Sequence, residues 1–115
     1  MRNLSIIFAL LFATKIFAAT PYTIALYGDG MKPNDNGYVA ADEVDKNGKI
    51  YKTSEPRMDI YFPKSGTPTA IILSCPGGGY TFTSIPNEGV AVANFFTARN
   101  MVVAVLKYRV PNMHK

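Results

Sequence analysis

The 115-residue sequence has only one cysteine and one histidine, and these low counts exclude an internal disulfide and some metal sites. A single cysteine, Cys75, cannot form a disulfide within the chain, and its place at the end of an apolar segment favours a buried thiol over one paired with another chain. A catalytic zinc ion takes three protein ligands, which one histidine and one cysteine cannot supply. We therefore expect no internal disulfide, no metal centre and no other cofactor.

Clusters of positive charge are also missing. The chain has 12 Lys and Arg, and without Arg2 and Lys15 it keeps 12 − 2 = 10 of them against eight Asp and Glu. These basic residues stand singly along the sequence, with no aromatic ladder between them. Because nucleic-acid binding needs dense positive charge for the phosphates and aromatic platforms for the bases, we expect no nucleic-acid partner.

No apolar run is long enough to cross a bilayer. The run at residues 4–13 falls short of the roughly 20 apolar residues of a transmembrane helix. Arg2 precedes it and Ala18 and Ala19 follow it, which is the order of a secretory signal peptide. We predict that residues 1–18 are a signal peptide, that the protein is secreted or periplasmic, and that it has no stable membrane anchor. An uncleaved anchor and a buried helix are the alternatives.

The segment after the signal predicts irregular structure and then a hairpin. Residues 19–41 are rich in Gly, Pro, Asn and Asp, which is typical of an irregular arm. Asn47-Gly48 suits the two positive φ angles of a type I′ turn. A calcium loop that began at Glu43 would need a bidentate carboxylate at its twelfth position, which is Ser54, so we interpret this segment as a turn.

Three segments have the pattern of strands. Residues 57–63 alternate, with Met58, Ile60 and Phe62 on one face, and Pro63 ends the strand. The apolar segments AIILSC and MVVAVLKY, residues 70–75 and 101–108, predict strands that are buried on both faces.

A helix is predicted between the two apolar strands, over residues 87–100, with Asn87 as its N-cap and Glu88 in its first turn. Strand, helix and strand form a βαβ unit, so the fold class is α/β, with a mainly parallel sheet and an antiparallel start. Arg109 follows the last strand, and we expect a structural ion pair for it in preference to a substrate contact.

The segment CPGGGY, residues 75–80, places three glycines where the strand of residues 70–75 ends. A Walker loop would need a following Gly-Lys-Ser/Thr, and a dinucleotide fingerprint from Gly77 would need glycine in place of Phe82. The third interpretation is an oxyanion hole formed by the backbone amides of Gly77, Gly78 and Gly79. A tight turn without a catalytic role is the alternative.

The segments EPRMDIYFP, AIILSCPGGGY and EGVAVANFFTARNMVVAVLKYRVP resemble the N-terminal part of the secreted bacterial α/β-hydrolase esterases related to acetyl xylan esterases. That family shares a Pro-Gly-Gly-Gly-Tyr turn and a Tyr-Arg-x-Pro sequence after the next strand, here residues 76–80 and 108–111. The resemblance extends over about residues 42–111, and we assign residues 42–115 to the N-terminal portion of such a domain.

The resemblance implies a carboxylic ester hydrolase that deacetylates plant polysaccharide or oligosaccharide with a Ser-His-Asp triad. Its substrate would be a small-molecule or carbohydrate ester, and Tyr80 would bind it or simply cover the turn. In the fold of that family, the strand of residues 101–108 inserts between those of residues 57–63 and 70–75. The outer edge of residues 70–75 would then pair with the strand that leads to the nucleophile.

The triad itself is not in the sequence. A Gly-x-Ser-x-Gly elbow is absent, and the family order Ser, Asp, His places all three residues after Lys115. Neither Ser74 nor Ser84 lies in an elbow, and His114 lies where the family has a loop, so none is predicted to be catalytic. We expect an N-terminal fragment that is inactive alone. The alternatives are a small exported binding module without catalysis and a serine peptidase of the same fold.

The signal peptide gives a first testable prediction. We expect cleavage near Ala18 or Ala19, because small residues follow the apolar run there. Edman sequencing of the protein recovered from the medium or periplasm measures the new N-terminus. Exported protein that still begins at Met1 would contradict this prediction.

Overall fold

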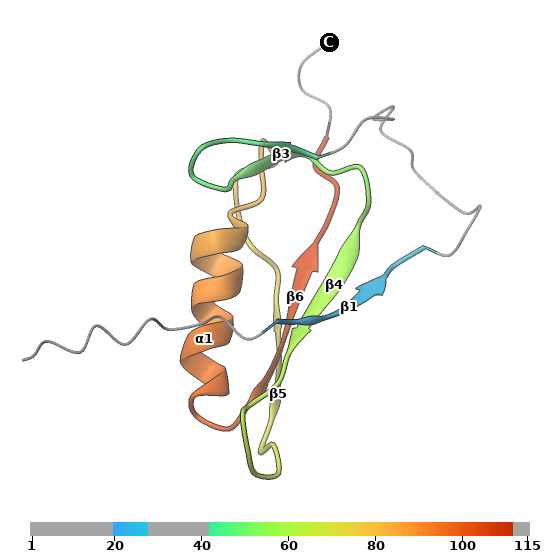
Figure 1. Cartoon of the computed structure of the whole chain (residues 1–115). Coiled ribbons are helices and arrows are strands. Elements are labelled where there is room, and N and C mark those ends of the chain that lie inside the picture. Colours follow the sequence, from blue (N-terminus) through green and yellow to red (C-terminus); the bar gives the residue numbers. More distant parts are fainter. Residues whose placement is uncertain (1–19, 28–41, 112–115) are drawn as a thin grey trace, which may run out of the picture.

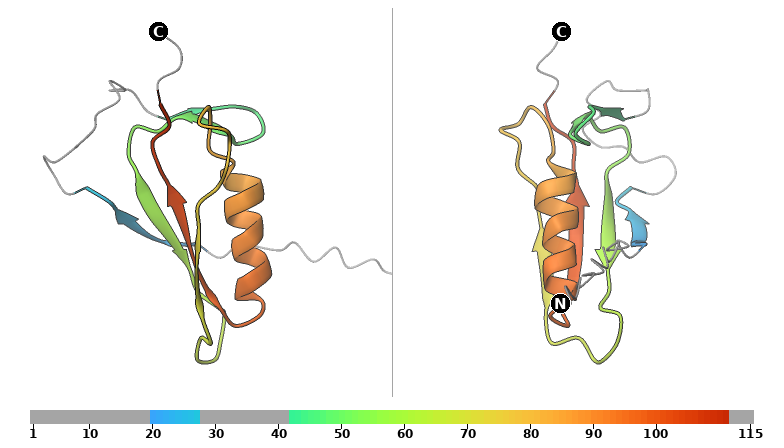
Figure 2. Two further views of the ribbon diagram at one scale, coloured as in Figure 1. Left: turned by 180° about the vertical axis from the view of Figure 1, so that it is seen from behind. Right: turned by 60° about the vertical axis from the view of Figure 1, so that its left-hand side comes forward.

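The computed structural model describes residues 20–27 and 42–111, so the predicted signal peptide, most of the predicted arm and His114 lie outside the described residues. A mixed four-stranded sheet has the order β1-β4-β6-β5 and a two-stranded sheet pairs β2 with β3. The strands are β1 (Tyr22–Ala25), β2 (Glu43–Val44), β3 (Ile50–Lys52), β4 (Arg57–Tyr61), β5 (Ile71–Ser74) and β6 (Val102–Lys107). Two consecutive helical segments, η1 (Ile85–Val90) and α1 (Ala91–Thr97), lie along one face of the larger sheet (Figure 1, Figure 2). In this part of the chain, no helix has the length and apolar character to span a membrane.

The position of β6 in the sheet confirms the predicted strand order. This strand lies between β4, to which it is antiparallel, and β5, to which it is parallel. The strand, helix and strand of residues 71–107 therefore form the predicted βαβ unit. The predicted majority of parallel pairs is wrong for the described sheet, because the β1–β4 and β4–β6 pairs are both antiparallel.

The helical segment begins earlier than the sequence predicts. Its backbone is helical from Ile85, so the prediction of Asn87 as N-cap is wrong. Pro86 falls in the first two positions, where a missing N–H costs nothing because no carbonyl within the helix would accept it. Glu88 lies in the first turn, as predicted, and its N–H donates to Ser84 O at 3.0 Å.

The core lies between the sheet and the helical segments. Tyr61 of β4 and Val103 and Val105 of β6 contact the fully buried Ala93 of α1. Around them pack Ile72, Ile85, Val90, Val92 and Phe96. Gly89 allows this approach, because a Cβ there would lie 2.7 Å from Val105 Cγ1.

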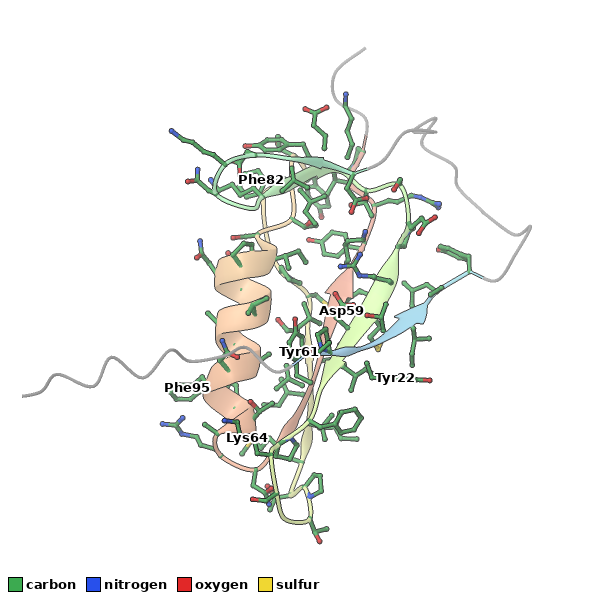
Figure 3. All side chains as sticks on the ribbon, viewed as in Figure 1. Tyr22, Asp59, Tyr61, Lys64, Phe82 and Phe95 are labelled. Carbon is green, nitrogen blue, oxygen red and sulfur yellow. The ribbon has the colours of Figure 1, made fainter. Side chains whose placement is uncertain are left out.

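The opposite face of the sheet is apolar too. The strand registers place side chains from all four strands on it, namely Tyr22, Ile24, Met58, Ile60, Ile71, Leu73, Val102, Ala104 and Leu106. Tyr22 points away from α1 (Figure 3), and Ile71 and Leu73 of the edge strand are 77% and 58% exposed. The prediction that residues 70–75 are buried on both faces is therefore wrong for the described structure. Cys75 is also exposed, which corrects the prediction of a buried thiol.

The polar residues on the inner face of β4 are paired. Asp59 is buried and accepts hydrogen bonds from Arg57 Nε at 2.9 Å and from Thr23 Oγ1 at 2.7 Å. The ion pair and the hydroxyl bond offset the cost of removing this carboxylate from water.

The predicted hairpin is present, but its turn is of another type. Gly48 has a φ of +76°, while Asn47 does not have the positive φ that a type I′ turn requires. Gly48 N–H donates to Asp45 O, and Asp45 N–H donates to Lys49 O, which closes a three-residue loop with glycine in its left-handed position. The Asp45 carboxylate accepts from the amides of Lys49 and Asn47, and these bonds lower its pKa. Among the described residues, no group of three His, Cys, Asp or Glu could hold a metal ion.

The exposed edge of β5 generates a second prediction. We expect residues 19–115, expressed alone, to associate or to stay partly unfolded, because an apolar strand edge with unpaired backbone groups templates aggregation. Replacing Leu73 with Lys should raise the fraction of monomer measured by light scattering. Val44→Lys, at a similarly exposed residue away from this edge, is the matched control. A soluble parent monomer with a cooperative thermal transition would show the prediction to be wrong.

Candidate functional site

The candidate site is the turn between β5 and η1. The turn follows the carboxyl end of β5 and lies beside the carboxyl end of β6, where Tyr108 follows the strand. Ligands of parallel α/β units bind at this end of the strands. The hairpin of β2 and β3 lies against the turn, with Phe82 beside it (Figure 3).

Gly78 and Gly79 need glycine for different reasons. Gly78 has a φ of +154°, and a Cβ there would lie 1.8 Å from the backbone oxygen of Phe82, so no side chain fits. Gly79 has a φ of +60°, but a Cβ there would meet nothing within 4 Å. Tyr80 has a φ of +61°, which is uncommon for a residue with a side chain, and it is 75% exposed.

The directions of the glycine amides follow from the hydrogen bonds of the turn. Ser84 N–H donates to Gly77 O at 2.9 Å, and Thr81 N–H donates to Gly78 O at 3.1 Å. In a trans peptide the C=O and N–H point in opposite directions. The N–H groups of Gly78 and Gly79 therefore point away from Ser84 and Thr81, and they donate to no group of residues 20–27 and 42–111.

The amide of Gly77 is already engaged. It donates to Glu88 Oε2 at 2.8 Å, so in this structure it is not available to an oxyanion. The preceding carbonyl, Pro76 O, accepts a hydrogen bond from the hydroxyl of Tyr108. Burial, and then electrostatic interactions with neighbouring groups that include Glu88, raise the pKa of Tyr108, so its hydroxyl stays protonated and can donate. An oxyanion role for Gly78 and Gly79 stays a prediction, and so does the contact of Tyr80 with substrate.

The far end of the turn is held by the hairpin. Ile50 and Thr83 exchange two backbone hydrogen bonds, of 2.8 and 3.1 Å. The ring centroids of Tyr51 and Phe82 are 5.5 Å apart, and Lys49 Nζ lies 4.6 Å from the centroid of Phe82. These contacts hold Phe82 and Thr83, whereas the amides of Gly78 and Gly79, earlier in the turn, have no hydrogen-bond acceptor among the described residues.

A buried ion pair that lies near the site was not predicted from the sequence. Lys107 is 2% exposed, and its Nζ lies 2.5 Å from Asp42 Oδ2. The other carboxylate oxygen, Oδ1, accepts from the amide and hydroxyl of Ser54. Burial raises the pKa of Asp42, but the hydrogen bonds from Lys107 and Ser54 outweigh it and leave the pKa below its usual value. A lysine within an apolar strand was the available signal, because a buried ammonium needs a partner.

The other polar candidates have structural contacts. Ser74 Oγ donates to the backbone oxygen of Glu88 at 2.6 Å, and Ser84 is buried, so neither is presented as a nucleophile. The guanidinium of Arg109 lies 5.4 Å from the ring centroid of Tyr27. The expected ion pair of Arg109 stays a prediction.

Comparison with known proteins gives a likeness to one bacterial esterase. No protein-family model and no curated protein matches the chain. Two solved structures of Thermogutta terrifontis esterase 2, one phosphorylated by paraoxon and one phosphoramylated by tabun, are each 27% identical to it with a TM-score of 0.42. Each match covers 64% of this chain and 29% or 28% of the esterase, so the chain spans less than a third of that protein's length. Because the TM-score is below 0.5, the likeness decides neither fold nor activity, and a functional proposal has to rest on the chain's own residues.

The contrast between Gly78 and Gly79 gives a third prediction. In the protein that the natural reading frame encodes, Gly78→Ala should destabilise strongly, because its Cβ would overlap the Phe82 backbone. Gly79→Ala should cost only the penalty for a positive φ, about 1–2 kcal/mol. Chemical denaturation measures both free energies of unfolding. Equal losses for the two variants would contradict the described shape of the turn.

Proposed function

We propose that this chain is the N-terminal part of a secreted carboxylic ester hydrolase of the α/β-hydrolase fold, and that the turn of residues 76–80 supplies its oxyanion hole. One observation carries the proposal. The amides of Gly78 and Gly79 are open at the carboxyl end of a βαβ unit, while the residues on both sides of them are held by hydrogen bonds.

The chemistry of ester cleavage suits such a pair of donors. When a nucleophile attacks the ester carbonyl, the carbon becomes tetrahedral and its oxygen takes on negative charge. Fixed N–H groups stabilise this oxyanion more than they stabilise the neutral carbonyl, so they lower the barrier and do more than bind substrate. Gly78 and Gly79 are the donors of this hole. The nucleophile, base and acid form a Ser-His-Asp triad that lies after residue 115 in the complete protein.

The proposed substrates are acetyl esters of plant polysaccharide or oligosaccharide. The resemblance of PGGGY and KYRVP to the acetyl xylan esterase relatives supports this class. Tyr80 supports it as well, because this exposed residue directly follows Gly79 and its side chain has both an apolar face and a hydroxyl for a sugar. The signal-like residues 1–18 are in keeping with a polymeric substrate outside the cell.

The nucleotide sequence beyond codon 115 tests the proposal first. An open frame that encodes Gly-x-Ser-x-Gly supports the hydrolase, whereas a stop codon followed by unrelated sequence favours a binding module without catalysis. Residues 19–115 alone should give no turnover of p-nitrophenyl acetate above a buffer blank. For the complete protein, acetylated xylo-oligosaccharides and peptide substrates in parallel distinguish an esterase from a peptidase.

Removal of one donor atom gives the fourth prediction. Replacing Gly79 with glycolate turns its backbone N–H into an ester oxygen and adds no side chain. In the complete enzyme this change should lower kcat for acetyl esters by roughly 10²–10³, the usual effect of losing one oxyanion donor.

Glycolate at Gly66 is the matched control for this experiment. Gly66 also has a positive φ, of +84°, but it lies in the loop before β5, at the other end of that strand. The control should keep kcat within about twofold of the parent, well inside the effect of losing a donor. A normal kcat for the Gly79 variant, in a folded enzyme, would contradict the oxyanion role.

A further inference from the structure

We infer that Glu88 and Tyr108 act together as positioning residues that clamp one peptide unit, Pro76–Gly77, and thereby set the direction of the open amides of Gly78 and Gly79. The clamp is a property of the described structure, and only its effect on kcat rests on the proposed function.

Both polar groups of a single planar unit are bound. The hydroxyl of Tyr108 donates to Pro76 O from the end of β6. The N–H of the same peptide unit, which belongs to Gly77, donates to Glu88 Oε2 at 2.8 Å from η1. Since the C=O and N–H of a trans peptide are fixed relative to each other, rotation of this unit breaks both bonds at once.

The two bonds reinforce each other. A carboxylate acceptor gives a stronger hydrogen bond to an amide than a neutral acceptor does. A bond to the amide N–H polarises the peptide and makes its carbonyl oxygen a better acceptor for Tyr108. The two side chains should therefore be coupled, although they lie 20 positions apart in the sequence.

Glu88 is itself held in place. Its backbone oxygen accepts from Ser74 Oγ at 2.6 Å, and its N–H donates to Ser84 O at 3.0 Å. Gly77 accommodates the carboxylate closely, because a Cβ there would lie 3.0 Å from Oε2. Within the described residues, the Glu88 carboxylate accepts a hydrogen bond from the Gly77 amide and none from the amides of η1. The carboxylate therefore binds the turn and does not cap its own helical segment.

The clamp also constrains the next two peptide units of the turn. With the Pro76–Gly77 unit fixed, two torsions of Gly77 decide where the N–H of Gly78 points. The bond from Ser84 N–H to Gly77 O then fixes the Gly77–Gly78 unit, and the bond from Thr81 N–H to Gly78 O fixes the Gly78–Gly79 unit. The open amides are thus preorganised by contacts on both sides of them, and such preorganisation is the condition under which oxyanion donors are effective.

The sequence offers a selective probe of this peptide. Pro76–Gly77 is the one Pro-Gly step in residues 1–115. Labelling with carbonyl-¹³C proline and ¹⁵N glycine limits the HNCO spectrum of the protein that the natural reading frame encodes to its Pro-Gly steps. A Pro76→Ala variant, which lacks the Pro76–Gly77 signal, identifies it. The carbonyl shift reports the bond from Tyr108 and the amide shift reports the bond to Glu88.

We expect Glu88→Gln to move the amide proton of Gly77 upfield and to speed its hydrogen exchange about tenfold. Tyr108→Phe should move the Pro76 carbonyl signal and also speed exchange at Gly77. In the double variant the effects on the logarithm of the exchange rate should be less than additive, because one rotation breaks both bonds. Glu55→Gln and Tyr22→Phe, at exposed residues away from the turn, are the matched controls and should leave the signal unchanged.

Steady-state kinetics distinguish a positioning role of Glu88 from a role in substrate binding. Glu88→Gln should lower kcat for an acetyl ester by about 10-fold to 10²-fold with little change in KM, because the donors are misplaced while substrate contacts remain. An unchanged Gly77 signal in Glu88→Gln, or additive effects in the double variant, would overturn the clamp. If the parent hydrolyses no ester, the proposed function fails and the labelled peptide still decides the clamp.

Discussion

The described fold depends on the pairing of β6 on both of its edges. This strand is antiparallel to β4 over five residue pairs and parallel to β5 over four, so it alone joins the two halves of the larger sheet. Its inner face carries Val103 and Val105, which pack against α1. Where it ends, it presents Lys107 to Asp42 and, one residue later, Tyr108 to Pro76. The same strand therefore organises the core and anchors the turn.

The ion pair between Lys107 and Asp42 also connects β6 to the hairpin of β2 and β3. Asp42 directly precedes β2, so its bond to Lys107 attaches the hairpin of β2 and β3 to the end of β6. The hairpin in turn pairs Ile50 with Thr83 and packs Tyr51 on Phe82. A buried pair of this kind contributes little net stability, but loss of one partner costs about 3–5 kcal/mol because a charge is left unpaired. Its main effect is to fix where the hairpin meets the turn.

The sequence predicts the elements whose pattern is local. The apolar run of residues 101–108, the alternation of residues 57–63 and the helix before residue 101 all match described elements, and the strand order was correct. The sequence did not predict the start of the helix. Asn87 is a residue type that favours the N-cap position, but the backbone is already helical from Ile85. The exposure of Cys75 and Leu73 was also missed, since an apolar pattern does not say whether a neighbouring layer covers it.

The contacts of the candidate site were the least predictable feature. PGGGY identifies a turn of unusual backbone, and that part follows from composition alone. Which amide is open depends on Glu88, 11 residues away, and on Tyr108, 32 residues from Pro76. No local pattern pairs these side chains with one peptide unit, because they meet only when η1 and β6 have packed on each other.

The same contacts bear on what kind of ligand the turn accepts. Glu88 places a carboxylate beside the open amides, and a neighbouring negative charge disfavours a ligand that is charged in its resting state, such as a phosphate. A neutral ester meets no such repulsion when it binds. In the proposed reaction the ester oxygen becomes negative only in the transition state, and the bond from Gly77 offsets part of the charge on Glu88. Under the proposed function, the amides of Gly78 and Gly79 therefore have to outweigh the repulsion between Glu88 and the oxyanion, and a neutral substrate suits the turn better than an anion that is charged in its resting state.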